Sequence, residues 1–305
     1  MKTIALAAAL IAPTVAAAQD APRADGGPAA GAEIYVSRDG DDTSMVKLLG
    51  RALVDYHGRD DYKGIAAEQV WITPMGGARV TQQRLYADLA GPLGNGWHYR
   101  ARVGTNFKTV LGSAEVRTDD YRTSLFVERD IVETPQGLQR GLMYTFAGVS
   151  QDVTFGPRDV LSLTGGVQEF SPGDNVRLHA RATYTHVLAE QAGLSFQLRG
   201  RYYHSTHPGE FDYYSPRNYA EVLPVLRMRR FLKDGSMVLG ALGYGAQRDD
   251  FSGWKPSRYA NLRYESPRNA RGWDAFADVT YTNNSSVSGI SYYYVLGRAG
   301  FTHRF

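Results

Sequence analysis

The chain has 305 residues, of which 43% are hydrophobic, 21% charged and 12% aromatic, and it contains no cysteine. This composition excludes a disulfide-stabilised scaffold and a disordered chain. Lys+Arg 34 against Asp+Glu 31 leaves a formal charge of +3, too near balance for a dedicated nucleic-acid-binding protein, so we expect no nucleic-acid partner. Only 6 of the 34 cations are lysine and 28 are arginine, and this excess of arginine needs a reason.

Residues 1–18 have the features of a secretory signal peptide rather than of a buried N-terminal helix. Lys2 supplies one positive charge, an almost wholly apolar run follows, and three alanines before Gln19 offer a small-residue cleavage site. The mature chain is therefore expected to begin at Gln19 and to be exported. The next stretch, 19–31, is rich in Pro, Gly and Ala without periodicity, which predicts a flexible lead-in.

From residue 43 to the C-terminus, apolar and polar residues alternate with a period of two, as in β-strands with one apolar face. In the segment 194–205, for example, Phe196 and Leu198 share one face and Arg199 lies on the other. A weaker candidate strand covers 32–37. Because bacterial barrels normally have even strand numbers, both 14 and 16 strands stay open. The fourteen clear segments are 43–57, 62–74, 78–92, 97–111, 121–132, 138–153, 158–170, 175–188, 194–205, 219–232, 237–248, 258–266, 272–283 and 290–305.

The length and regularity of this alternation favour a membrane barrel over a soluble sandwich. It continues for over 250 residues with no helical block, whereas a typical sandwich has seven to nine strands. Segments of about 10 to 15 residues suit tilted membrane strands, and lipid admits strands only in a closed barrel. We therefore predict an all-β, transmembrane antiparallel up-and-down β-barrel of 14 to 16 strands over 32–305, in the outer membrane of a Gram-negative bacterium.

On this interpretation the polar face of each strand lines a wet, cationic lumen. Arginine suits such a surface because its planar fork binds hydroxyl and carboxylate groups in pairs and stacks on rings. Glu128, Glu221, Glu265 and Asp278 are possible countercharges, and the alternative role of the arginines is to brace the barrel through such pairs. The residues predicted to line the lumen and contact cargo are Arg177, Arg181, Arg199, Arg201, Arg227, Arg229, Arg263, Arg298 and Tyr203.

The longest clear connection, from Thr206 to Asn218, is predicted to be extracellular when strands are counted back from a periplasmic C-terminus. Long extracellular loops of barrels commonly fold into the lumen. Phe211, Tyr213 and Tyr214 are therefore candidates for a gate that touches sugar rings, and a passive surface loop is the alternative. Most of the other tyrosines are expected in the two interfacial girdles.

Enzymatic chemistry finds little support in the sequence. The chain has no Gly-x-Ser-x-Gly elbow and no phosphate-binding loop, and its only close histidine pair, His204 and His207, lacks further ligands at metal-site spacing. We therefore predict no catalytic residue, no metal site and no cofactor.

Three short motifs resemble those of exopolysaccharide exporters. They are Asp174-Asn175-x-Arg177, the Tyr213-Tyr214-Ser215-Pro216 run that leads into a strand containing Pro224, and the terminal Phe305. The chain looks like the C-terminal barrel of the cellulose exporter encoded in cellulose synthase operons, the poly-N-acetylglucosamine export porin and YaiO-type outer-membrane proteins. In those exporters a helical tetratricopeptide scaffold usually precedes the barrel, and here only residues 19–31 do.

The resemblance implies a channel for a secreted polysaccharide, supplied by a periplasmic delivery partner. Many weak contacts along the lumen suit passage, because one tight site would stall the polymer. Other expected partners are outer-membrane lipid, lipopolysaccharide and the barrel assembly machinery, which the aromatic C-terminus would engage. The alternatives are a general small-solute porin, a barrel enzyme and a surface assembly protein.

Overall fold

The computed structural model describes residues 26–267, 272–285 and 291–305. The predicted signal peptide, 1–18, lies outside the described residues. The described chain forms sixteen strands and one short helix, α1 (Pro135–Arg140). The strands are β1 (Ala29–Asp39), β2 (Ser44–Gly58), β3 (Asp61–Thr73), β4 (Val80–Gly94), β5 (Trp97–Thr105), β6 (Val110–Thr118), β7 (Thr123–Ile131), β8 (Met143–Thr154), β9 (Asp159–Ser171), β10 (Val176–Ala189), β11 (Leu194–Ser205), β12 (Asn218–Phe231), β13 (Met237–Asp249), β14 (Ser252–Glu265), β15 (Trp273–Ser285) and β16 (Ser291–Arg304).

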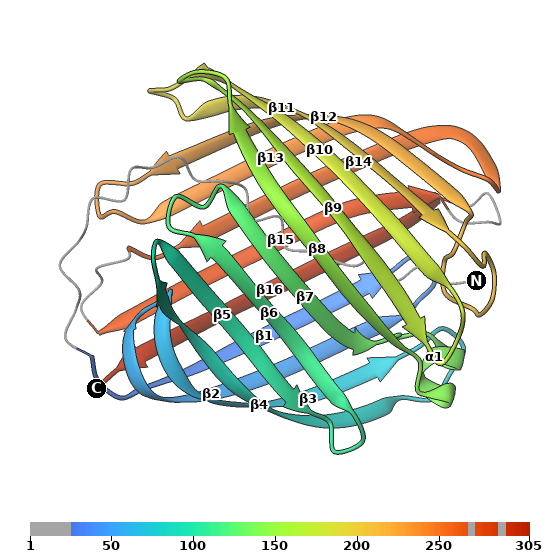
Figure 1. The fold of residues 1–305 in the computed structure, drawn as a ribbon, viewed down its shortest axis with the longest axis horizontal. Coiled ribbons are helices and arrows are strands. Elements are labelled where there is room, and N and C mark those ends of the chain that lie inside the picture. The colour runs from blue at the N-terminus through green and yellow to red at the C-terminus, as the bar shows by residue number, and fades with distance from the viewer. Residues whose placement is uncertain (1–25, 268–271, 286–290) are drawn as a thin grey trace.

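The strands close into one antiparallel barrel. Each strand pairs with its neighbours in the sequence, and β1 pairs with β16 from Ala29 opposite Arg304 to Asp39 opposite Tyr294. Figure 1 shows this closure, with the blue β1 beside the red β16. Closure leaves no unpaired strand edge, as lipid requires. The predicted fold is confirmed, with 16 strands rather than 14.

Two strand assignments from the sequence are wrong, one at a hairpin with a weak turn signal and one at the start of the first strand. The predicted segment 97–111 joins β5 to the start of β6, and most of β6 was missed. The turn between them has only one residue typical of turns, Asn106, whose side-chain oxygen accepts hydrogen bonds from the backbone N–H of Lys108 and Thr109. At the N-terminus, β1 begins at Ala29, inside the predicted lead-in of 19–31.

The helical turn α1 takes the first three residues of the predicted segment 138–153, and the strand β8 begins only at Met143. Thr134 caps α1 by accepting a hydrogen bond from Gly137 N at 3.0 Å, Pro135 opens the helix, and Gly141 ends it at φ 68°. These are ordinary start and stop signals for a helix, so the expectation of no helical block was wrong for a reason visible in the sequence. No helix in the described ranges is both long and apolar enough to cross a membrane.

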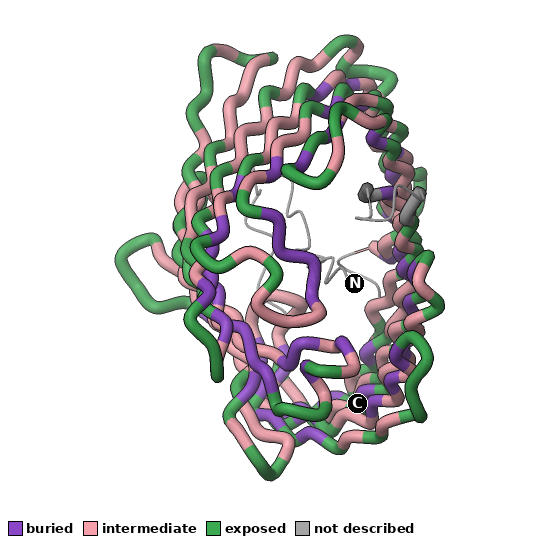
Figure 2. The backbone as a smooth tube through the Cα atoms, turned by 90° about the vertical axis from the view of Figure 1, so that its right-hand side faces the viewer, coloured by how far each residue is buried: buried purple, intermediate pink, exposed green. Residues whose placement is uncertain are grey.

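The two faces of the barrel differ in polarity. Large apolar side chains are exposed on the outer face, among them Leu178, Leu198 and Leu262, while charged and aromatic side chains one residue along the strand turn inward. The longer connections, 132–142 and 206–217, lie at one end, and turns such as 59–60 and 95–96 lie at the other. By the usual arrangement the α1 end is extracellular and the other end periplasmic. Figure 2 looks toward the α1 end and shows buried chain inside the outline of the barrel.

Candidate functional site in the barrel lumen

Six arginines form a strip along the inner face of three neighbouring strands. The arginine strip consists of Arg177 and Arg181 on β10, Arg199 and Arg201 on β11, and Arg227 and Arg229 on β12. The guanidinium of Arg199 lies 4.7 Å from the ring centre of Tyr259 on β14, across β12 and β13. Such a contact is possible only on the concave side, so the strip lies on the inner face of the barrel.

The strip places like charges beside one another. In the register of β10 and β11, Arg181 lies directly opposite Arg201. Arg201 has a carboxylate partner, since its Nε lies 3.8 Å from Glu221 Oε2. Within the described part of the chain, no carboxylate forms an ion pair within 4.0 Å with the other strip residues Arg177, Arg181, Arg199, Arg227 or Arg229. The positive charge of these five arginines is therefore not neutralised by a described carboxylate, and one of them, Arg177, is buried.

Aromatic rings hold several strip guanidinium groups in place. The Arg177 guanidinium lies 5.1 Å from the ring centre of Phe170 and 4.5 Å from that of Tyr203. Arg201 stacks in the same way on Tyr219, at 4.7 Å. These cation–π contacts fix the planar groups without using up all of their hydrogen-bond donors.

Arg263 and Arg298, also predicted to line the lumen, are paired with carboxylates instead. Arg263 Nη2 lies 2.5 Å from Glu265 Oε1, and Arg298 Nε lies 3.9 Å from Asp278 Oδ1. Of the predicted countercharges, Glu221, Glu265 and Asp278 therefore contact arginine. Glu128 instead accepts a hydrogen bond from the Tyr144 hydroxyl at 2.7 Å.

The opposite wall, β1 to β7, carries an ion network that was not predicted from the sequence. Asp88 Oδ2 lies 3.5 Å from Arg51 and 3.0 Å from Arg102, while Arg84 reaches Glu68 at 3.3 Å and Asp130 at 3.2 Å. The signal was available, because Arg84 and Asp88 alternate with apolar residues along β4. On this wall the arginines therefore form ion pairs with carboxylates of the same chain.

At the extracellular end, loop 206–217 packs against the inner wall. The ring of Tyr213 stacks on Phe170 at 4.2 Å between centroids, and Asn175 Nδ2 donates to the Tyr213 hydroxyl at 2.7 Å. The Tyr214 hydroxyl donates to Asp249, and Arg177 Nη2 donates to the Tyr214 carbonyl at 2.7 Å. Burial raises the pKa of the Tyr213 phenol, which keeps it protonated.

Two carboxylates fasten the same loop to its neighbours. Glu210 accepts from the backbone N–H of Asp174 at 2.8 Å and of Asn175 at 3.2 Å, in the turn between β9 and β10. Asp212 accepts from the Thr134 hydroxyl and from Gln136 N, at the start of α1. The loop therefore bridges from β11 and β12 to α1 over the inner wall. The ring centroids of Phe211 and Tyr213 lie 6.3 Å apart in this packed segment. The gating role of these residues stays a prediction.

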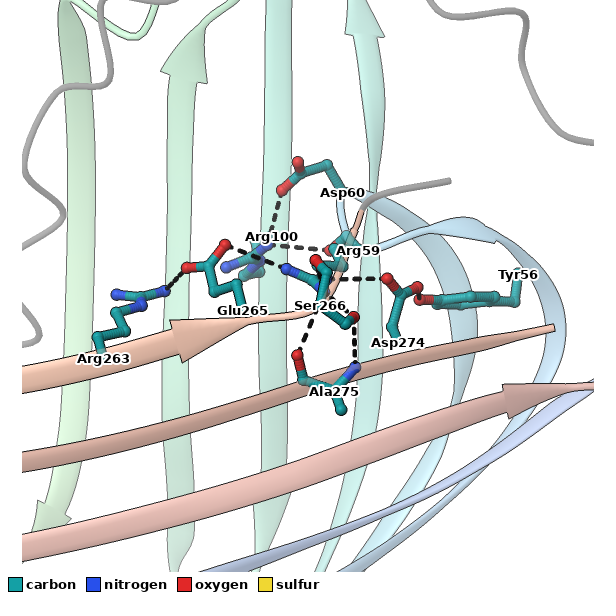
Figure 3. A network of polar contacts seen from close by, with 9 residues as sticks. All are labelled: Tyr56, Arg59, Asp60, Arg100, Arg263, Glu265, Ser266, Asp274 and Ala275. Atoms are coloured by element: carbon teal, nitrogen blue, oxygen red, sulfur yellow. Dashed lines mark hydrogen bonds and ion pairs between the residues drawn. The ribbon is translucent and has the colours of Figure 1, made fainter. Parts of the chain in front are cut away.

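At the periplasmic end, the turn between β2 and β3 reaches β14 and β15 (Figure 3). Arg59 donates to Asp274 Oδ1 and to Glu265 Oε2, both at 3.1 Å, and to Ser266 Oγ at 2.8 Å. The Tyr56 hydroxyl donates to the other oxygen of Asp274.

From the same turn, a second set of contacts reaches β5 and β6. Asp60 Oδ1 accepts from Arg100 Nη2 and from Arg117 Nη2, both at 2.8 Å, on β5 and β6. Turn 59–60 thus joins two sectors of the barrel that are separated by several strands. We call this set of contacts the periplasmic network. No pattern in the sequence pointed to it, because Arg59 and Asp274 are 215 positions apart.

Single cysteines test which side chains face the lumen, and the native chain has none to interfere. A membrane-impermeant thiol reagent should modify Arg199→Cys and Arg263→Cys in the folded barrel. It should spare Leu198→Cys and Leu262→Cys, which face lipid, because side chains alternate with a period of two. Labelling with the opposite preference would show an inverted register.

A closed barrel of 16 antiparallel strands with an apolar outer surface and a charged interior is the architecture of the bacterial outer membrane. The chain is therefore a Gram-negative outer-membrane β-barrel protein with a channel-like fold. Neither a scan of protein-family models nor a search of curated proteins found a match.

Solved structures with this fold are numerous. One described as a bacterial polysaccharide outer membrane secretin aligns with a TM-score of 0.64 and 15% identity, over 90% of this chain and 98% of that one. The KdgM porin in complex with disordered oligogalacturonate aligns with a TM-score of 0.39 and 11% identity, over 90% of this chain and 99% of that one. The outer membrane protein opdK from Pseudomonas aeruginosa aligns with a TM-score of 0.45 and 8% identity, over 92% of this chain and 99% of that one. At 15% identity the likeness to the polysaccharide secretin concerns the fold alone.

Proposed function

We propose that this barrel is the outer-membrane channel for a secreted polysaccharide. The observation that carries the proposal is the arginine strip with its interleaved rings, Phe170, Tyr203, Tyr219 and Tyr259. Guanidinium groups hydrogen-bond sugar oxygens, and the rings, three of which are buried, hold the guanidinium groups in place. Many such weak contacts in series let a polymer slide, whereas a single tight site would hold it.

The strip runs along the barrel from one end to the other. Arg177 is the second residue of β10, at the extracellular end, and Arg229 lies two residues before the periplasmic end of β12. A track of this length suits a chain molecule that contacts several residues at once. The fold likeness to the polysaccharide secretin agrees with the proposal.

The proposal includes a periplasmic partner that delivers the polymer, and it assigns transport rather than catalysis to the lumen. Among the described residues, no group of three His, Cys, Asp or Glu side chains is arranged to hold a metal ion.

The test is deletion of the gene in the native host, with surface polysaccharide measured by immunoblot or lectin binding. Loss of the surface polymer, restored by the wild-type gene, is the expected result. Unchanged polymer together with slower uptake of small solutes would replace the proposal with a small-solute porin.

A further inference from the structure

The charge of the lumen is divided between its two walls. On the inner face of β10 to β12 the six strip arginines face a single carboxylate, Glu221. On the facing wall, Arg51, Arg84 and Arg102 each have a carboxylate within 4.0 Å. Arginines without a carboxylate partner are thus gathered on one side of the channel, whereas these three arginines of the facing wall are paired.

Within the described chain, the pair of Arg201 with Glu221 relieves only part of the repulsion within the strip. Arg181 and Arg201 are direct cross-strand partners, an arrangement that destabilises a sheet when the charges are alike. Arg227 and Arg229 are two residues apart on β12, so their side chains point to the same side of the sheet. Arg229 Nη1 is buried and has no hydrogen-bond acceptor among the described residues. An anion in the lumen would satisfy these donors and remove the repulsion.

We propose that the cargo is an acidic polysaccharide, whose carboxylates move along the arginine strip. This rests on the proposed function and names its substrate class. The planar fork of arginine binds a carboxylate through two parallel hydrogen bonds. Arg177 and Arg199 already donate from Nε and Nη2 to groups of the protein. The forks of Arg181, Arg227 and Arg229 have no acceptor among the described residues and are the ones open to the cargo. The arginines of the strip lie one after another along the barrel, which suits a polymer that carries one carboxylate on each of several sugar rings. A small inorganic anion would need only one such position.

The experiment measures occlusion of single channels formed by the full-length mature barrel in planar bilayers. Hexagalacturonate is the acidic probe and maltohexaose is the neutral probe of equal length. The variant Arg181→Gln/Arg227→Gln removes two strip charges. The control variant Arg248→Gln/Arg258→Gln removes two arginines that are exposed on β13 and β14 outside the strip. Slower gel migration after boiling confirms that each variant has formed a closed barrel.

Hexagalacturonate is expected to occlude the wild-type and control channels at a concentration at least about tenfold below that of maltohexaose. In the strip variant the difference between the two probes should shrink at least about threefold, because two of the six strip charges are removed. Equal occlusion of the wild type by both probes would overturn the acidic cargo and leave a polysaccharide channel. Failure of both to occlude a conducting barrel would overturn the proposed function itself. A tenfold preference that persists in the strip variant would overturn the assignment of the strip.

Discussion

Replacement of residues 207–216 by a Gly-Ser pair is expected to raise single-channel conductance at least about twofold, because the loop covers the inner wall at the extracellular mouth. The loop is held there by Glu210, Asp212, Tyr213 and Tyr214, each through hydrogen bonds to other elements. Its removal uncovers the inner faces of Phe170 and Tyr219 without touching a strand. Planar-bilayer recording of both proteins at equal salt gives the comparison.

The matched control shortens another extracellular connection, Met75 to Arg79, whose residues are exposed. Conductance should not change there, because that turn has no buried residue in the lumen. If shortening either connection has the same effect, or if loss of 207–216 leaves conductance unchanged, the loop does not constrict the channel.

A milder change separates the packing of the loop from its presence. Tyr213→Phe/Tyr214→Phe keeps both rings and removes the hydroxyls bonded to Asn175 and Asp249. Each lost hydrogen bond costs about 0.5–1.5 kcal/mol, so the loop should detach more often while the barrel still assembles. We expect more frequent transitions between conductance levels, together with lower surface polysaccharide in the native host. Steady current at the wild-type level would count against a gating role for these tyrosines.

Arg59→Ala is expected to lower the free energy of unfolding by about 1–3 kcal/mol, because it leaves the largely buried Asp274 carboxylate without its cation, while Glu265 keeps its pair with Arg263. The side chains of Glu265 and Asp274 are 17% and 13% exposed, whereas that of Arg59 is 23% exposed, so partial solvation keeps the loss below that of a fully buried pair. Urea unfolding in detergent micelles, followed by tryptophan fluorescence, measures the change. The same variant should conduct more current, because turn 59–60 is then released from β14 and β15.

Arg122→Ala is the matched control from another periplasmic turn. Arg122 is 57% exposed and pairs with the equally exposed Asp120 at 3.6 Å, so its removal should change stability by less than about 0.5 kcal/mol. Arg59→Lys adds a second comparison, since lysine keeps the charge but lacks the fork that reaches Glu265 and Asp274 together. Equal stability of Arg59→Ala and Arg122→Ala would show that the periplasmic network does not hold the mouth together.

The alternation of side chains was enough to predict the class of fold, the membrane and the inner face of most strands. Its physical basis is local, because successive side chains of a strand point to opposite sides whatever the strand pairs with. Arg199 and Leu198 could therefore be assigned to opposite faces before any pairing was known. The same reasoning failed at β6 and α1, where a turn with one typical residue and a short capped helix broke the period.

Which side chains meet across the lumen was decided by the tertiary structure alone. Arg59 and Asp274 are brought together because β1 pairs with β16, and closure of the barrel places the two ends of the chain side by side. The contrast between a paired wall and an unpaired arginine strip depends in the same way on strand register, which sets which charges lie within a few ångströms. Alternation fixes the side to which a residue points, but Coulomb attraction falls with distance, and those distances exist only once the barrel has closed.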